Sequence, residues 1–137
     1  MAANGDYFEA LRKVSKTFNF KFDKDALLEI IVDTTREVLD LKATSIYLTD
    51  EERDEILLLY QKGLSEEYIQ TGLTGAQTIL PVLKKNGYLY ARDVGTNEQL
   101  DKHEAKVKEG IASLLIVPIT VANTIIGIIS MYTSTPR

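Results

Sequence analysis

Residues 110–133 of the chain read GIASLLIVPITVANTIIGIISMYT, the longest apolar run in the sequence. Its two halves, residues 114–121 and 124–132, are rich in Ile, Val and Leu, as is typical of buried strands. The Ala-Asn pair between them suits a tight hairpin turn. The run is long enough to cross a membrane, but its proline, asparagine and threonines, the flanking glycines and the β-branched bias favour a sheet. The stretch therefore predicts a buried β-hairpin that the rest of the chain must cover.

The composition predicts one ordinary globular domain. The chain has 137 residues, of which 45% are hydrophobic and 26% charged, and this length is enough for a substantial core. The net charge of −4 provides no basic surface for nucleic acid or an anionic membrane. The first ten residues lack the basic region and apolar core of a signal peptide. We therefore expect a cytoplasmic protein that neither inserts into a membrane nor binds nucleic acid.

The chain has no cysteine and one histidine, His103. The first fact excludes disulfides, thiolate metal sites and cysteine nucleophiles, and the second disfavours a histidine metal cluster or a Ser-His-Asp triad. A catalytic site built from Asp93, Glu104 and His103 also lacks a nucleophile, a metal and paired carboxylates at usable spacing. We therefore expect no enzyme activity, no metal and no cofactor.

An N-terminal helix and connector are expected at residues 1–22, ahead of a globular unit at residues 23–137. A heptad-like spacing of four, three and four residues within this segment predicts an apolar seam on a short helix. Two interpretations remain open, because the seam can pack on its own domain or pair with its copy in a second chain. The second makes a candidate dimer interface of Tyr7, Leu11, Val14 and Phe18.

The remaining pattern predicts helices alternating with short strands. Periodicity and capping residues indicate helices at 24–41, at 65–71 with Ser65 as cap, at 77–85 with Pro81 in its first turn, and at 98–109 with Asn97 as cap. Strands are predicted at 43–49, 55–62 and 88–94. At least five strands joined mostly by hairpins imply an α+β domain with an antiparallel sheet covered by helices.

Four stretches in this order carry a family resemblance: ATSIYLTD (43–50), EILLLYQKGLSEEYI (55–69), LKKNGYLYARDV (83–94) and EGIASLLIVPITVANTIIGIISMYTSTPR (109–137). The most specific part is Gly-Ile-x-Ser-Leu-Leu-x-Val-Pro, followed by a turn, Ile-Gly-x-Ile and Thr-x-x-Pro-Arg. The chain resembles a GAF domain over nearly its whole length. The resemblance implies a GAF/PAS-like central antiparallel sheet of about six strands flanked by helices. Helices on one side would make dimer contacts, and loops and short helices on the other would close over a small-molecule pocket.

The resemblance implies a non-catalytic, small-molecule-sensing module of a larger signal-transduction protein. Its output domain would belong to a histidine kinase, a cyclic-dinucleotide enzyme or a transcriptional activator, and the ligand state would pass through the helices of a homodimer. The family's C-terminal signalling helix would begin after Arg137 and is expected to be absent. The alternative is a ligand-free GAF domain that acts only in dimerisation or protein interaction.

Several ligands known for the family can be excluded or disfavoured from the sequence. Bilin attachment and methionine sulfoxide reduction both need a cysteine. The Asn-Lys…Phe…Asp-Glu signature of cyclic-nucleotide GAF domains is missing between Gly87 and Gly110. Haem bound through His103 is the remaining cofactor interpretation, although a lone histidine at a helix edge is more often a structural residue. The ligand is therefore left unidentified.

The resemblance also places a candidate pocket wall. Within it, Arg92 can hold a carboxylate or phosphate, Asp93 can accept from an amine or hydroxyl, and Tyr90 can stack on a ring. Equally, Arg92 can pair with a surface glutamate, Asp93 can cap a turn, and Tyr90 can belong to the half-buried surface of the sheet. The full candidate set is Tyr90, Arg92, Asp93, Thr96, His103, Val107, Ser113 and Leu115.

Overall fold

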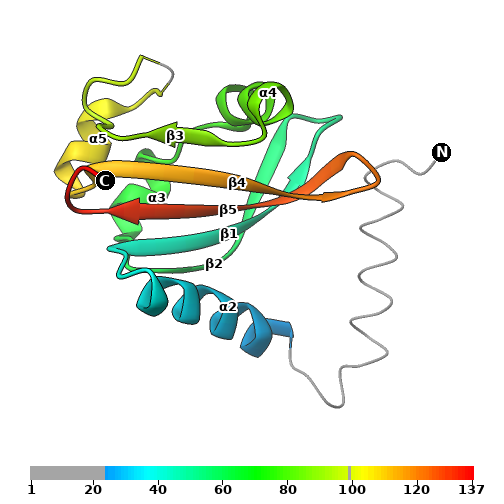
Figure 1. The fold of residues 1–137 in the computed structure, drawn as a ribbon, viewed down its shortest axis with the longest axis horizontal. Helices are drawn as coiled ribbons and strands as arrows, with labels where there is room; N and C mark the ends of the chain where they lie inside the picture. The colour runs from blue at the N-terminus through cyan, green and yellow to red at the C-terminus, as the bar shows by residue number, and fades with distance from the viewer. Residues whose placement is uncertain (1–23, 99) are drawn as a thin grey trace.

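The computed structural model describes residues 24–98 and 100–137, and it forms one antiparallel sheet flanked by helices (Figure 1). The strand order is β2-β1-β5-β4-β3. Helix α2 (Lys24–Val38) leads into strands β1 (Ala43–Asp50) and β2 (Glu55–Lys62), followed by α3 (Glu66–Thr71), α4 (Ala76–Asn86), β3 (Leu89–Ala91), α5 (His103–Lys108), β4 (Ser113–Val121) and β5 (Thr124–Thr133). The predicted α+β class and its antiparallel sheet are confirmed. The expected N-terminal helix, with its seam of Tyr7, Leu11, Val14 and Phe18, lies outside the described residues.

The hairpin β4–β5 is the centre of the sheet. Strand β5 pairs with β4 on one side and with β1 on the other, and Ile128 in its middle is completely buried. The joint residues Ala122 and Asn123 both have positive φ, at 51° and 67°. Positive φ at both central positions matches the right-handed twist of the flanking strands. The hairpin predicted from the sequence is therefore confirmed, including its turn.

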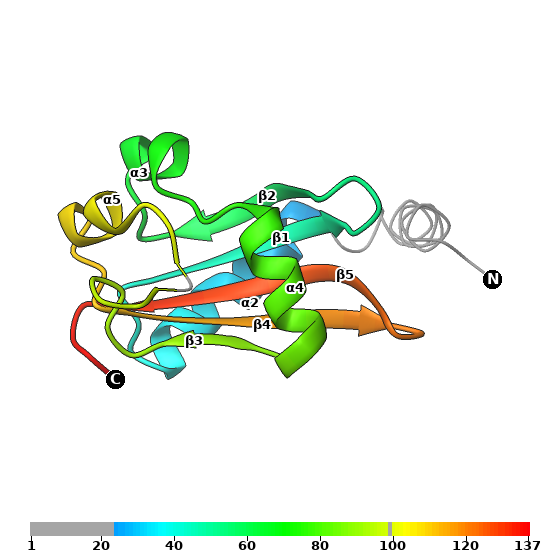
Figure 2. The same cartoon turned by 90° about the horizontal axis from the view of Figure 1, so that it is seen from above.

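The two faces of the sheet are covered by different elements (Figures 1 and 2). Helix α2 packs on one face, against β1 and β2, and its Val32 is completely buried. Helices α3, α4 and α5 lie over the other face. Because side chains alternate along a strand, the β1–β5 pairs Ser45–Ser130 and Tyr47–Ile128 face α3 and α4. The main apolar core lies on this side of the sheet.

Several element boundaries differ from the predictions, and α2 ends at Val38 instead of residue 41. Helix α5 begins at His103 instead of residue 98, because the preceding Lys102 adopts a left-handed conformation with φ 53°. Strand β3 ends at Ala91 because the chain then turns at Asp93, whose Oδ1 accepts from the backbone N–H of Gly95. Pro81 lies inside α4, since the helix begins at Ala76 and packs Ile79, Leu80 and Leu83 into the core.

The predicted cap Ser65 is confirmed, whereas the predicted cap Asn97 is wrong, because α5 begins at His103 and its N-cap is Lys102. Ser65 accepts a hydrogen bond from the backbone N–H of Tyr68 at the start of α3. Gly87 ends α4 at φ 82°. Within residues 24–98 and 100–137, no helix has the length and apolar character needed to cross a membrane.

Candidate functional site

A small cavity lies between the core face of the sheet and helices α3 and α4. Its volume is about 10 Å³, which is enough for about one water molecule. Strand residues form its floor, and α3, α4 and the α3–α4 loop (residues 72–75) form its cover. The lining residues are Tyr47, Ile56, Tyr68, Leu73, Thr74, Ile79, Leu114, Ile116, Ser130 and Tyr132.

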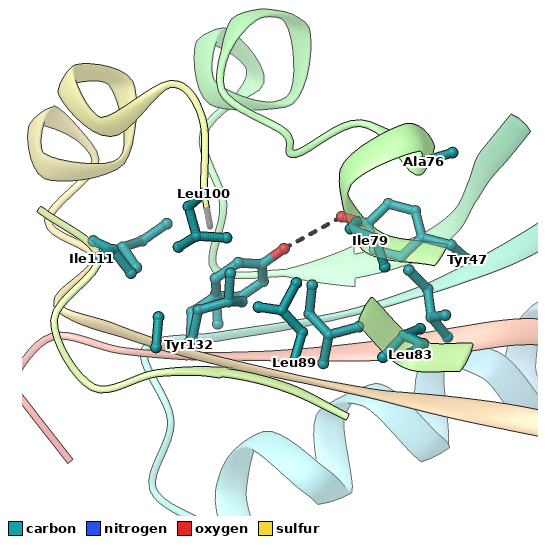
Figure 3. Close-up of a cluster of buried hydrophobic side chains, with 14 of the residues drawn as sticks. Tyr47, Ala76, Ile79, Leu83, Leu89, Leu100, Ile111 and Tyr132 are labelled. Atoms are coloured by element: carbon teal, nitrogen blue, oxygen red, sulfur yellow. Dashed lines mark hydrogen bonds between the residues drawn. The ribbon is translucent and has the colours of Figure 1, made fainter. Parts of the chain in front are cut away.

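Three buried hydroxyl groups form a triangle beside this cavity, which we call the hydroxyl triad: Ser45, Tyr47 and Tyr132. Ser45 donates to the Tyr47 hydroxyl at 3.1 Å, and the Tyr132 oxygen lies 3.3 Å from each of the other two. Figure 3 shows the contact between the two phenols. The triad forms because residues 45 and 47 share one face of β1, and the antiparallel register brings Tyr132 of β5 onto that face.

The phenols of Tyr47 and Tyr68 are held neutral by burial. Burial raises the pKa of Tyr47 far above its ordinary value, and the neighbouring Tyr132 raises it further. Burial also raises the pKa of Tyr68 well above the ordinary range. The Tyr68 ring stands edge-on to Tyr132, with ring centres 6.4 Å apart, a favoured aromatic geometry. The cavity wall therefore carries no charge at physiological pH.

Thr74 places an unpaired hydroxyl in the cavity wall. Its residue exposure is 5%, and its Oγ1 has no hydrogen-bond partner among the residues that the structure describes. A buried hydroxyl without a partner costs about 1–3 kcal/mol. Thr74 therefore combines a place in the cavity lining with a buried hydroxyl that lacks a partner.

A buried lysine supports the loop that carries Thr74. Lys106 of α5 is 0% exposed, and its Nζ donates to the carbonyls of Gly72 at 2.9 Å and Asp101 at 3.0 Å. The Asp101 carboxylate lies 3.9 Å away. Burial lowers the pKa of Lys106 to about 8, and Asp101 offsets this only in part. Lys102 adds a second support, donating to the Leu73 carbonyl at 2.9 Å.

Further polar contacts join α3 to α5. The Glu109 carboxylate accepts from both the backbone N–H and the hydroxyl of Ser65, each at 2.6 Å. Lys108 pairs with Glu67 at 2.7 Å. Helix α3 and the α3–α4 loop, which belong to the cover, are therefore connected to α5 by side-chain contacts.

Three of the predicted site residues lie on the sheet face opposite the cavity. Tyr90 and Leu115 are paired across β3 and β4, and Tyr90 donates to the Arg137 carbonyl at 2.5 Å. Ser113 is buried and bonds to the Thr133 hydroxyl. The reason is strand alternation: Leu89 and Ala91 face the core, so Tyr90 between them faces away.

The other five candidates lie on or near the surface beyond β3. Arg92 and Thr96 are exposed. Asp93 is also exposed and closes a turn onto Gly95, as its alternative interpretation proposed. The ring Nε2 of His103 lies 2.7 Å from the Asn97 carbonyl, and Val107 is 58% exposed. None of the eight predicted residues lines this cavity, and their part in ligand binding stays a prediction.

Sequence reasoning missed the lining residues and Lys106. The period-two pattern of residues 43–49 was the available signal for Ser45 and Tyr47, which it placed on one face. Nothing distinguishes Lys106 from the other charged residues of its helix. Val107, a candidate pocket residue, is exposed, whereas Lys106 beside it is buried against the α3–α4 loop. Within the described ranges, no group of three or more His, Cys, Asp or Glu side chains is placed to hold a metal ion.

A comparison with family models and a comparison with solved structures both find the same family. The family model of the GAF domain matches residues 23–137. The GAF domain of a phosphoenolpyruvate-protein phosphotransferase from Coxiella burnetii is similar in structure, with a TM-score of 0.67 and 17% identity, over 99% of this chain and 82% of that one. No curated protein matches the chain significantly.

Two other solved structures show the same fold. The GAF domain of an Acinetobacter phosphoenolpyruvate-protein phosphotransferase has a TM-score of 0.63 at 21% identity, covering 95% of this chain and 78% of that one. A GAF domain/HD domain protein from Geobacter sulfurreducens has a TM-score of 0.65 at 20% identity, covering 82% and 76%.

Proposed function

Because this chain belongs to the GAF domain family, we propose that it is a non-catalytic sensory or regulatory module of a larger signal-transduction protein. A small molecule bound between the sheet and the α3–α4 cover sets its state. The observation that carries this proposal is the cavity wall, in which an unpaired Thr74 hydroxyl lies among the buried side chains around the hydroxyl triad. A buried hydroxyl without a partner is costly, so a molecule that pairs with the Thr74 hydroxyl is favoured there.

Ligand binding requires the cover to move outward. Pockets for organic ligands usually have volumes of about 300–1,000 Å³, whereas this cavity measures about 10 Å³. The α3–α4 loop is held by side chains of Lys102 and Lys106, so a shift of the loop acts on the segment that contains α5. A ligand that favours the open arrangement then changes the balance between two states.

The route from the cover to the outer helix is short. The backbone N–H of Ala112, just after α5, donates to the Thr133 carbonyl at the end of β5. Beyond β5, the Arg137 guanidinium donates to the carbonyls of Leu39 at 2.8 Å and Asp40 at 3.3 Å. These carbonyls directly follow α2, so the end of the sheet and the end of α2 are joined. We propose that ligand state reaches α2 by this path.

Native mass spectrometry of the freshly purified protein, with and without the Thr74→Val change, tests the sensor proposal. We expect a discrete added mass on the wild type and a loss of at least tenfold in its occupancy on the variant. Valine retains the shape but removes the unpaired hydroxyl, so the ligand-free variant should gain about 1 kcal/mol of unfolding free energy. Ligand sensing would be refuted if the wild type carried no added mass and if no compound of a small-molecule library raised its melting temperature.

An apolar stripe on α2 supports a second candidate function, dimerisation without a ligand. Ile30 is 61% exposed and Val38 is 74% exposed, and Leu27 lies on the same stripe at 48%. Among the elements that the structure describes, α2 packs its other face on β1 and β2, and this stripe remains exposed. Such a stripe at helical spacing is suited to pack against the same helix of a second copy.

Charge introduced into the stripe should separate the copies. We expect Ile30→Lys to raise the dimer dissociation constant at least tenfold, measured by sedimentation velocity, because a buried unpaired charge opposes association. Glu37→Gln changes the net charge by the same amount at an exposed position of the same helix, and should leave the constant unchanged. A dimer that tolerates Ile30→Lys would place the interface elsewhere.

A further inference from the structure

We infer that the cavity selects an uncharged ligand that presents a hydrogen-bond acceptor to Tyr132 and Thr74. This inference rests on the proposed sensor function of the same site and adds the chemical class of the ligand. Three features of the wall carry it: its lack of charge, the weak satisfaction of the Tyr132 hydroxyl, and the unpaired Thr74 hydroxyl.

The wall offers no counter-charge to an ion. Its polar members are all hydroxyl side chains, and the others are aliphatic. Removing a carboxylate, phosphate or ammonium from water is costly unless a charged partner replaces the water. The phenols do not provide one by ionising, since burial raises the pKa of Tyr47 and of Tyr68. Anions and cations are therefore disfavoured equally.

Lys106, the buried cation that supports the α3–α4 loop, already has hydrogen-bond partners outside the cavity. Lys106 directs its Nζ at two backbone carbonyls, at 2.9 and 3.0 Å, and at the Asp101 carboxylate at 3.9 Å. It is not among the residues that line the cavity. An anion in the cavity would have to break these contacts to reach the ammonium group.

Within the hydroxyl triad, the Tyr132 hydroxyl makes only long hydrogen bonds. Each hydroxyl has one proton, and Ser45 gives its proton to Tyr47 at 3.1 Å. Both contacts of Tyr132 measure 3.3 Å, longer than the usual O–H···O range of about 2.5–3.0 Å. The Tyr132 proton can therefore turn to a ligand acceptor with little loss.

Thr74 adds a second unused donor from the cover. Tyr132 and Thr74 both line the cavity, so a carbonyl or hydroxyl oxygen that enters as the cover opens would take up these donors. The apolar body of the same ligand would contact aliphatic residues on both sides of the cavity, including Ile79 of α4 and Leu114 and Ile116 of β4. The ligand class is therefore a small uncharged amide, ketone or alcohol.

Probes of equal shape and different charge test this inference. We would titrate the full chain at pH 7 with acetamide, acetate and acetamidinium, and with benzamide, benzoate and benzamidinium, and follow the amide NMR signals of residues around the cavity. We expect the amides to shift these signals with a Kd at least tenfold lower than either charged relative. Tighter binding of benzoate or benzamidinium at the cavity would overturn the inference while leaving the sensor function intact. Absence of binding by all six probes would overturn the inference, whereas the sensor function itself is refuted only by the mass-spectrometry and library test given above.

Hydroxyl deletions test the acceptor requirement. Tyr132→Phe and Thr74→Val should each raise the benzamide Kd about tenfold, because each removes a donor. Tyr60→Phe is the matched control, since Tyr60 pairs with Ile46 on the α2 face of the sheet and its loss should leave the Kd unchanged. Amide spectra of all variants report whether the fold is kept. Unchanged benzamide affinity in both cavity variants, with signals still shifting around the cavity, would refute the acceptor requirement.

Discussion

Replacing Lys106 with alanine is expected to lower the free energy of unfolding by about 3 kcal/mol at pH 7. The change leaves the buried Gly72 carbonyl without its donor, at about 1–3 kcal/mol, and the part-buried Asp101 carbonyl without its donor at a smaller cost. It also removes a fully buried side chain. Relief from burying the charge offsets part of this loss. Urea denaturation followed by circular dichroism measures the difference.

Two further variants separate the effect of the Lys106 charge from that of its packing, and a buried lysine from an exposed one. Lys106→Met keeps most of the packing and removes the charge, so it should lose less stability than alanine. Lys108→Ala removes an exposed lysine of the same helix, whose pairing with Glu67 is on the surface, and should have a much smaller effect. Equal effects of Lys106→Ala and Lys108→Ala would show that the carbonyl contacts of Lys106 do not support the fold.

The pH dependence of stability provides an independent test of the same residue. The pKa of Lys106 is about 8 in the folded chain and 10.5 ordinarily, so between these values the unfolded chain retains a proton that the folded chain has released. Stability from this group therefore rises with pH above about 8. Below pH 8 the buried charge costs roughly 3 kcal/mol, at 1.36 kcal/mol per pKa unit.

The pH range in which the effect of Lys106 on stability can be measured ends near pH 10. Above the ordinary tyrosine pKa of 10.0, the unfolded phenols lose protons while the raised pKa values of Tyr47 and Tyr68 keep the folded ones protonated. Stability then falls as pH rises. We expect the unfolding free energy of the wild type to increase from pH 8 to 10 relative to that of Lys106→Met. Parallel profiles for the two proteins would contradict a buried, charged Lys106.

Gly63→Ala is the second change with a large expected effect, a loss of about 2–5 kcal/mol. Gly63 follows β2 with φ +97°, and a Cβ there would lie 2.3 Å from the Lys42 carbonyl oxygen and 2.9 Å from the Ala43 Cα. Left-handed strain costs about 1–2 kcal/mol, and forced displacement of packed backbone adds about 1–3 kcal/mol. Chemical denaturation measures the loss.

Gly75→Ala is the matched control for Gly63→Ala. Its Cβ would meet nothing within 4 Å, and Gly75 has an ordinary φ of −73° at the start of α4. Its expected cost is under about 1 kcal/mol, from the weaker helix cap. If Gly63→Ala were as stable as this control, the close approach of Gly63 to β1 would be disproved.

Elements with local signals were predicted well. The β4–β5 hairpin follows from two β-branched runs and a turn that tolerates positive φ at Ala122 and Asn123. Ser65 and Gly87 mark a helix start and a helix end by their own side-chain or backbone chemistry. These signals act over a few residues, so no knowledge of distant contacts was needed.

The candidate site was predicted poorly because it depends on distant contacts. Strand β3 has only three residues, and its pairing with β4 decides that Tyr90 faces away from the cavity. The start of α5 decides that Lys106 is buried while Val107 is exposed. A shift of one position on a strand, or of a few on a helix, changes the face of every side chain.

By itself, the sequence determined the family, the α+β class and the order of most elements, because periodicity and turn chemistry are local properties of the chain. Only the tertiary structure decided which hydroxyls meet. Ser45 and Tyr132 are 87 positions apart along the chain, and Lys106 is 34 positions from the carbonyl it supports. Such contacts depend on strand register and on the helices that cover each face, which are set by the packing of the whole domain.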